Sequence, residues 1–218
     1  IDLLIKKMIS LFNLNSNSKI FEIGCNDGHM LKIMKRNGFK YLEGIEPTKD
    51  SFKLAKKQIN EVHNDFFSSK FVAKKKLKNF DLVYSRQVFE HLNNLNDKLK
   101  GVHKMLKNKG KLLIEVPMHD MYLENLDYTF WEEHINYFTK KSLYYLLQKN
   151  KFRIFHHETT LFSGKAIIIF AEKVNTRIKT NQNFDEEHRK IKNYINNFKN
   201  FKKNLNNFLK NFKVKPII

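Results

Sequence analysis

Hydrophobic positions recur at two different spacings along the chain, and each spacing predicts its own kind of element. Apolar residues three to four positions apart predict amphipathic helices at residues 1–14, 29–36, 50–60, 92–106 and 140–149. Short apolar runs bounded by polar or glycine-containing breaks predict strands at residues 19–23, 41–46, 62–64, 80–85, 111–116, 152–159 and 166–173. Strands and helices therefore alternate along most of the chain.

This alternation predicts a mostly parallel sheet with helices on both of its faces. The last two strands are joined by a short connection around Ser163 and Gly164, which predicts an antiparallel hairpin. A parallel sheet that ends in such a hairpin resembles the class I methyltransferase fold, a Rossmann-like α/β fold with seven strands. We therefore expect that fold class rather than the dinucleotide-binding version.

The pattern changes after residue 174, and this change predicts two parts. Residues 1–174 form the α/β domain, and residues 175–218 form a basic helical extension. Apolar and aromatic residues at helical spacing within 184–212 favour a helix that packs on its own domain or on a second copy of the chain. Binding of RNA or of a membrane surface is the alternative for this helix. Residues 214–218 resemble the start of a strand in a truncated further domain.

Composition excludes several classes of protein. No apolar run is long enough to cross a bilayer, so we expect no membrane span. Cys25 is the single cysteine, which excludes an internal disulfide and a multi-cysteine zinc site. A reducing, cytoplasmic setting fits this cysteine content.

The formal net charge of +19 has two interpretations. A strongly basic chain is typical of nucleic-acid binding. Lysine and asparagine are both abundant here while alanine, glycine and proline are scarce, and a compositional bias of the gene explains that pattern without any role for RNA. We favour the second interpretation and expect no nucleic-acid partner. A positive field also favours an acidic small molecule, such as a nucleotide sugar.

The segment that follows the first predicted strand carries the clearest motif. It reads Phe-Glu-Ile-Gly-Cys-Asn-Asp-Gly and places Gly24 and Gly28 four residues apart. A dinucleotide fingerprint needs glycine where this chain has Asn26 and His29. Asparagine tolerates a left-handed backbone, so the segment matches E-x-G-x-(G/N)-x-G, the methyltransferase form. The predicted cofactor residues of this loop are Glu22, Gly24, Asn26, Asp27 and Gly28.

Polar residues at the ends of the next strands extend the predicted site. Glu46 ends the second strand about 20 residues beyond the loop, where a carboxylate accepts hydrogen bonds from ribose hydroxyls. Asp65 follows the third strand, facing the adenine amino group, with Phe66 against the ring. Arg86 and Gln87 follow the fourth strand and border the same pocket. The alternatives are a simple turn for the two glycines and a helix cap for Asp65.

Several motifs together resemble one known family. The Glu22–Gly28 loop looks like the E-I-G-S-N-D-G loop of sugar C-methyltransferases that act on nucleotide-linked keto-deoxysugars. Further motifs of that family are similar to Phe-Glu-His at 89–91, Ile-Glu-Val-Pro at 114–117 and Glu-His-Ile-Asn-Tyr-Phe at 133–138. The resemblance covers residues 15–173. It implies S-adenosylmethionine as cofactor and a nucleotide sugar as small-molecule acceptor.

The resemblance also implies a catalytic base. The histidine of the E-H-x-x-Y-F segment, His134, removes a proton beside the ketone of the acceptor, and Glu133 orients it. Imidazole titrates near neutrality and is suited to this step. The resulting enolate attacks the methyl group of the sulfonium in line. A structural role for His134, capping or packing beneath the helix that follows Thr139, is the alternative.

The chain departs from this family in three respects. Trp131 stands where the family has a tyrosine, so Tyr128 or Tyr137 has to supply any stabilisation of the enolate. The family carries a cysteine-rich zinc domain before the cofactor domain, and a second α/β domain after it. Neither is contained in these residues, and we expect a fragment of a longer protein or a reduced relative.

Other functions remain open at this level. One is O- or N-methylation of another metabolite or of RNA, and another is a catalytically inactive cofactor-binding module. His91 is interpreted as a pocket wall or part of a helix start. His156 and His157 lie on opposite faces of a strand and do not ligate one ion together, so no metal site is expected.

Overall fold

The structure is a computed structural model that describes residues 2–120, 131–161, 165–180 and 183–211. Its strands are β1 Lys19–Ile23, β2 Tyr41–Ile45, β3 Glu61–His63, β4 Phe80–Arg86, β5 Leu106–Pro117, β6 Phe152–Thr160 and β7 Ala166–Lys173. Its helices are α1 Asp2–Phe12, α2 His29–Arg36, α3 Lys49–Gln58, α4 Ser69–Lys74, α5 Leu95–Met105, α7 Lys140–Lys149 and α8 Asp185–Lys210, with a 3-10 turn, η1, at Phe89–His91. Tyr128, the turn at Ser163 and Gly164, and residues 214–218 lie outside the described residues.

The strands form one seven-stranded sheet in the order β3-β2-β1-β4-β5-β7-β6. Neighbouring strands from β3 through β5 are parallel, whereas β7 is antiparallel to both β5 and β6. The predicted α/β fold with a terminal antiparallel hairpin is confirmed. The order reverses direction at β1, so the loops after β1 and β4 lie side by side at the carboxyl edge, where open α/β sheets bind ligands.

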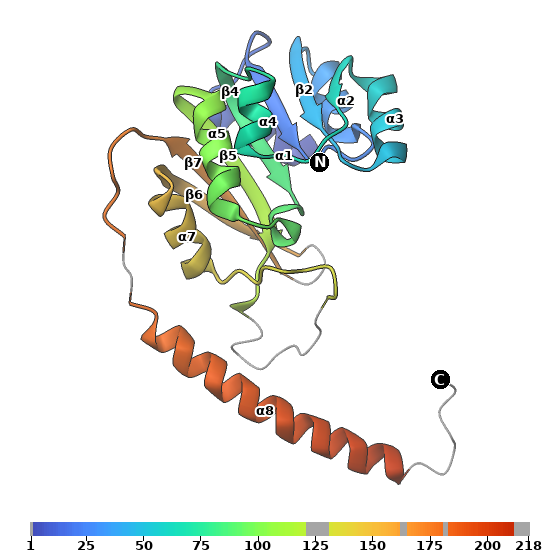
Figure 1. Ribbon diagram of the computed structural model, residues 1–218, viewed down its shortest axis with the longest axis vertical. Coiled ribbons are helices and arrows are strands. Elements are labelled where there is room, and N and C mark those ends of the chain that lie inside the picture. The colour runs from blue at the N-terminus through green and yellow to red at the C-terminus, as the bar shows by residue number, and fades with distance from the viewer. Residues whose placement is uncertain (1, 121–130, 162–164, 181–182, 212–218) are drawn as a thin grey trace.

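Helices lie on both faces of the sheet (Figure 1), and an apolar core fills the space on each face. On one face, buried side chains of α1, α2 and α3 pack on strand residues such as Leu82 and Leu113. On the other face, α4, α5 and α7 pack on residues such as Val83 and Ile114. Successive strand residues point to opposite faces, so continuous apolar runs in β4 and β5 supply both cores.

The structure contains one helix that was not predicted, and two predicted elements start three or more residues from the expected position. The short helix α4 was not predicted, because the lysines at 74–76 interrupt its apolar pattern, although Phe71 and Val72 are buried. The helix predicted from residue 92 starts at Leu95, because Leu92 has an extended backbone and the Asn94 side chain caps the helix by accepting the Asp97 N–H. Strand β5 begins at Leu106 rather than Lys111, with a register shift against β4 where a turn was predicted.

Helix α8 extends away from the sheet (Figure 1). Its start touches α7 through the Lys141–Glu187 ion pair at 2.8 Å, and Phe184 just before it lies against Tyr145. Exposed apolar side chains follow along the helix, namely Ile191, Ile195, Phe201, Leu205, Phe208 and Leu209. These contacts lie at the beginning of α8, and Tyr194 further along the helix is buried as well. Within the described residues, no helix combines the length and the apolar character that crossing a bilayer requires.

Candidate active site

The loop between β1 and α2 has the backbone that its sequence predicts. Gly24, Asn26 and Gly28 all have left-handed φ angles, of 69°, 49° and 78°. A Cβ on residue 24 would lie 2.5 Å from a methyl carbon of Val88. Glycine at this position therefore lets the loop approach the segment after β4 more closely than a residue with a side chain would. Asp27 is exposed and its carboxylate accepts the His29 N–H at 3.0 Å, at the start of α2.

Glu46 is joined to this loop directly. One of its carboxylate oxygens accepts the Asn26 N–H at 3.0 Å, and the other accepts the Thr48 N–H at 2.9 Å. The side chain is buried, and each oxygen retains a lone pair for a further donor. The structure thus brings together Gly24, Asn26 and Glu46, which the sequence analysis placed in one pocket.

Glu22 is a second buried carboxylate at the same edge. Its Oε2 and the Tyr84 hydroxyl are enclosed and have no hydrogen-bond partner of ordinary geometry within the described residues. Burial raises the pKa of Glu22 to about 8, and the neighbouring Tyr84 and Arg86 lower it only in part. An enclosed carboxylate oxygen of this kind fits a cationic or hydrogen-bond-donating group of a ligand.

Asp65 and Phe66 lie at the carboxyl end of β3, as predicted. Both are exposed, and the Phe66 side chain is 72% accessible. The Asp65 carboxylate accepts the Phe66 N–H at 2.8 Å. Asn64 ties this segment to the end of β2 by donating to the carbonyl oxygens of Glu46 and Pro47, each at 2.9 Å. The backbone that leads to Phe66 is therefore tied to the end of β2.

Arg86 and Gln87 end β4, and Arg86 has a partner that the sequence analysis did not identify. Its guanidinium forms an ion pair with the buried carboxylate of Glu115 on β5. Gln87 has a left-handed φ of 53°, and its amide nitrogen is enclosed without a hydrogen-bond partner in the described part of the chain. Gln87 thus offers the pocket a donor, whereas Arg86 is partly committed to Glu115.

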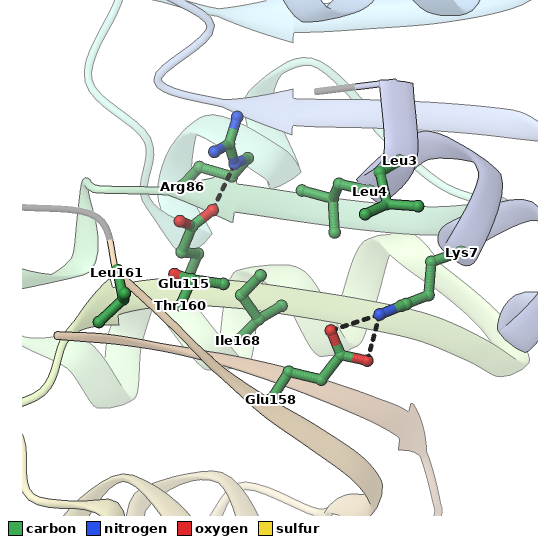
Figure 2. A pocket seen from close by; sticks show the side chains of 9 residues that line it. All are labelled: Leu3, Leu4, Lys7, Arg86, Glu115, Glu158, Thr160, Leu161 and Ile168. Atoms are coloured by element: carbon green, nitrogen blue, oxygen red, sulfur yellow. Dashed lines mark hydrogen bonds and ion pairs between the residues drawn. The ribbon is translucent and has the colours of Figure 1, made fainter.

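Arg86 also borders a pocket of about 280 Å³ beneath α1 (Figure 2). Arg86, Glu115, Ile168 and Glu158 stand in one row across the sheet, because they are register partners on adjacent strands. Figure 2 shows Leu3 and Leu4 of α1 facing this row, and Lys7 contacting Glu158 at 2.6 Å. The sequence analysis missed this pocket, since its residues are far apart along the chain.

His134 lies above η1, in the loop that precedes α7. Its ring is 4.8 Å from the ring of His91, and its Nδ1 is enclosed without a hydrogen-bond partner within the described residues. Burial and the neighbouring His91 lower the pKa of His134, while Glu133 opposes that shift. The predicted base is therefore held in a half-buried position beside other polar groups.

Glu133 and Glu90 occupy contrasting positions near His134. The Glu133 side chain is exposed, and its backbone carbonyl lies 2.9 Å from Nδ1 of His91. Glu90 is buried, and burial raises its pKa to about 7. No role was predicted for Glu90, which belongs to the Phe-Glu-His motif at 89–91. In the structure its carboxylate is enclosed beside His91 and His134.

Tyr137 was one of the two tyrosines predicted to substitute for the tyrosine of the family. It contacts Trp131, which stands in that tyrosine's place. Its hydroxyl accepts the Trp131 N–H and donates to the Trp131 carbonyl oxygen, both at 3.1 Å. The indole of Trp131 is half exposed, with its ring centroid 6.2 Å from that of His134. Tyr137 therefore braces the loop that carries His134.

Similar proteins agree on one family. The methyltransferase domain family matches residues 2–157. The C-methyltransferase NovU of Streptomyces niveus is 26% identical over 171 residues, covering 77% of this chain and 40% of NovU. The phosphoethanolamine N-methyltransferase of Plasmodium falciparum is 30% identical over 113 residues, covering 50% of this chain and 42% of that protein. The chain thus spans less than half the length of these curated relatives.

Solved structures of methyltransferases share the overall fold of this chain. An S-adenosylmethionine-dependent methyltransferase from Methanosarcina mazei superposes with a TM-score of 0.61 at 16% identity, covering 77% of this chain and 97% of that protein. At this identity the likeness shows the fold alone, while the family match covers most of the sequence. The chain therefore belongs to the methyltransferase domain family and has its class I, Rossmann-like fold.

Proposed function

We propose that this chain binds S-adenosylmethionine at the loop after β1 and transfers its methyl group to a small-molecule acceptor. The observation that carries the proposal is the contact between that loop and Glu46, which aligns a left-handed, glycine-containing backbone with a buried carboxylate at the carboxyl edge of the sheet. Such an edge is where a nucleoside ligand finds both backbone access and a partner for its ribose. Membership of the methyltransferase family supports the same assignment.

The residues present fit the chemical groups of this cofactor. Glu46 has one lone pair on each oxygen for the two ribose hydroxyls, and the exposed ring of Phe66 offers a face for adenine, with Asp65 beside it. Glu22, with an oxygen that lacks a partner in the described structure, suits the cofactor's ammonium group. An adjacent ammonium favours the ionised form of a buried carboxylate.

His134 is proposed as the general base. When bound, S-adenosylmethionine supplies an electrophilic methyl group on a positively charged sulfur. The chain has to supply a nucleophile, and a carbon beside a ketone becomes one only after it loses a proton. The His134 imidazole, held by the bracing of Tyr137 and Trp131, accepts that proton on a ring nitrogen. Gln87, which follows β4, supplies an amide N–H donor at the same edge.

The acceptor is proposed to be a nucleotide-linked keto-deoxysugar in the cytoplasm. Similarity to the C-methyltransferase NovU supports a carbon acceptor. The net charge of +19 attracts an anionic nucleoside diphosphate. The sugar carries no charge of its own, so the diphosphate has to provide the electrostatic attraction. Residues 1–174 suffice for the cofactor site in this proposal.

Hydrogen exchange at the acceptor carbon tests the base apart from methyl transfer. The chain is incubated in heavy water with S-adenosylhomocysteine and a nucleoside-diphosphate-linked 4-keto-6-deoxysugar, and deuterium at the carbon beside the ketone is followed by NMR. His134→Ala should slow this exchange by about 10²–10⁴-fold, while cofactor affinity stays within about twofold of wild type. His156→Ala, a histidine paired with Glu158 outside the site, serves as the matched control. Exchange at the wild-type rate in His134→Ala would refute the assignment.

N-methylation is the second candidate, and the similarity to a phosphoethanolamine N-methyltransferase favours it. An amine needs only deprotonation and placement next to the cofactor, so His134 suits this reaction also. Methyl transfer from labelled cofactor to phosphoethanolamine, with no deuterium exchange into the keto sugar, would select this candidate. Retained cofactor binding with no transfer to either acceptor would indicate a binding module.

A further inference from the structure

Two imidazoles and a carboxylate form a cluster beside the proposed acceptor site. Glu90 and His91 belong to η1, and His134 belongs to the loop before α7. One nitrogen or carboxylate oxygen from each of the three residues lies within 4.8 Å of the corresponding atoms of the other two. Nε2 of His91 is 3.8 Å from Oε1 of Glu90. Imidazole nitrogens and carboxylate oxygens are both common metal ligands. The fold brings them together here although residues 90 and 134 are distant in sequence.

Backbone hydrogen bonds hold the two segments together. The carbonyl oxygen of Glu90 accepts the N–H groups of Ile135 and Asn136, both at 3.0 Å. The Asn136 side-chain amide donates to the carbonyl oxygens of Phe89 at 3.1 Å and Leu92 at 2.8 Å. The loop that carries His134 is therefore tied to both ends of η1. The proximity of the three side chains follows from these bonds.

Two atoms of the cluster lack the partners that burial demands. Glu90 is 1% exposed, and its Oε2 has no hydrogen-bond partner within the described residues. Nδ1 of His134 is enclosed in the same way. A buried carboxylate oxygen without a partner costs folding free energy, and a bound cation removes that cost.

The third residue is oriented as a metal-ligating histidine is. Nδ1 of His91 lies 2.9 Å from the carbonyl oxygen of Glu133, which can only accept, so Nδ1 carries the proton. Nε2, which faces Glu90, then keeps its lone pair. Metal-binding histidines usually donate their other ring N–H to a carbonyl or a carboxylate in this manner.

We propose that Glu90, His91 and His134 bind one divalent transition-metal ion. Two imidazole nitrogens and one carboxylate oxygen suit Zn²⁺, Co²⁺ or Fe²⁺ and leave a coordination position open. Ligand atoms around a tetrahedral Zn²⁺ are about 3.4 Å apart, so atoms separated by up to 4.8 Å have to close by up to about 1.4 Å. Nε2 of His91 and Oε1 of Glu90, at 3.8 Å, are already close to that spacing. No metal site was expected from the sequence, which does not reveal that His91 and His134 meet.

This metal site does not depend on the proposed methyl transfer. The two do interact, because a metal held by a ring nitrogen of His134 restrains the imidazole that the proposed reaction uses as a base. We therefore expect Zn²⁺ to inhibit methyl transfer and a chelator to restore it. Binding of the metal is measured without any acceptor, so failure of the methyl-transfer proposal leaves this test intact.

Titration of the tag-free full chain with Co²⁺ tests the site, with visible absorption of the ion and calorimetry with Zn²⁺ as readouts. Wild type should bind one ion per chain. His91→Gln and His134→Gln should each weaken binding by about tenfold or more. His156→Gln should bind as wild type does, since His156 lies beside one carboxylate, Glu158 at 2.8 Å, outside the cluster.

Circular dichroism and cofactor binding establish that each variant is folded. If the buried Glu90→Gln variant does not fold, the two histidine variants decide the question alone. Absence of Co²⁺ and Zn²⁺ binding to wild type overturns the proposal. Binding that survives His91→Gln or His134→Gln unchanged overturns it equally, because the cluster then does not hold the ion.

Discussion

Two buried carboxylates at the end of β1 and β2 are held in different ways. Both oxygens of Glu46 accept backbone N–H groups, whereas Glu22 has an oxygen without a partner in the described structure. Desolvation is therefore little compensated at Glu22, and burial raises its pKa from the ordinary value of 4.5 to about 8. The difference lies in the neighbouring donors, since both side chains are almost fully buried.

Glu22→Gln should change how stability depends on pH. Folded wild type keeps a proton on Glu22 that the unfolded chain loses above about pH 4.5, so the free energy of unfolding contains a contribution that falls as pH rises toward about 8. Glutamine cannot titrate. The decrease in the free energy of unfolding between pH 5 and pH 8 should therefore be smaller in the variant than in wild type, by at least about 1 kcal/mol. Urea denaturation at the two pH values measures it. An equal fall in both proteins would contradict the account, and Glu61→Gln, at an exposed position, is the control.

At this scale the sequence predicts contacts that lie within one motif and misses those that depend on how loops cross. Gly24, Asn26 and Gly28 are left-handed as expected, because five consecutive residues determine that turn. The pairing of Arg86 with Glu115 requires the register between β4 and β5. The meeting of His91 with His134 requires the path of the loop before α7, which no local pattern encodes.

Helix α7 begins with a reciprocal cap between Thr139 and Ser142. The Thr139 hydroxyl accepts the Ser142 N–H at 3.1 Å, and the Ser142 hydroxyl accepts the Thr139 N–H at 2.9 Å. Thr48 stands at the same position before α3 but makes no side-chain cap. Both positions are threonine, but only Thr139 makes the capping hydrogen bond.

Thr139→Ala should lower the free energy of unfolding by about 1 kcal/mol, because one N–H at the start of α7 loses its acceptor. Thr48→Ala should change it by clearly less. Thermal or urea unfolding of both variants measures the difference. Equal losses would show that the cap bond of α7 contributes nothing beyond the intrinsic preferences of threonine and alanine.

Elements were predicted where periodicity is long and missed where it is short. Helix α2 starts and ends at the residues expected, since Gly28 and Asn37 mark its limits. Helix α4 spans only six residues beside a lysine run, too short for a 3.6-residue period to show. Turn η1 was not predicted, because three residues are too few to show a helical period, yet η1 is what turns Glu90 inward.

At the scale of the whole molecule, α8 is set apart from the sheet that carries the proposed site (Figure 1). Among the described residues, the Lys141–Glu187 ion pair and the Tyr145–Phe184 ring contact join its start to the domain, and Tyr194 further along is buried. Residue 174 still belongs to the domain, since the Val174 carbonyl oxygen lies 3.0 Å from Nε2 of His103. The boundary after residue 174 is proposed on these contacts.

A chain that ends at residue 178 should fold and bind cofactor as the full chain does. A partly exposed ion pair, one ring contact and the burial of Tyr194 are lost, so the free energy of unfolding should fall by about 2–5 kcal/mol. Denaturation and cofactor titration check both statements. An unfolded product, or a large loss of cofactor affinity, would mean that α8 is part of the domain.

The central claim is that the loop after β1 and Glu46 form a site for S-adenosylmethionine. Isothermal titration of the full chain with this cofactor tests it most directly, with Glu46→Gln as the variant and Glu43→Gln, which loses a contact to His63 instead, as the control. The account predicts one cofactor per chain, an affinity reduced about tenfold or more in Glu46→Gln, and wild-type affinity in Glu43→Gln. Absence of binding to wild type at millimolar cofactor, or equal affinity in Glu46→Gln, would contradict it.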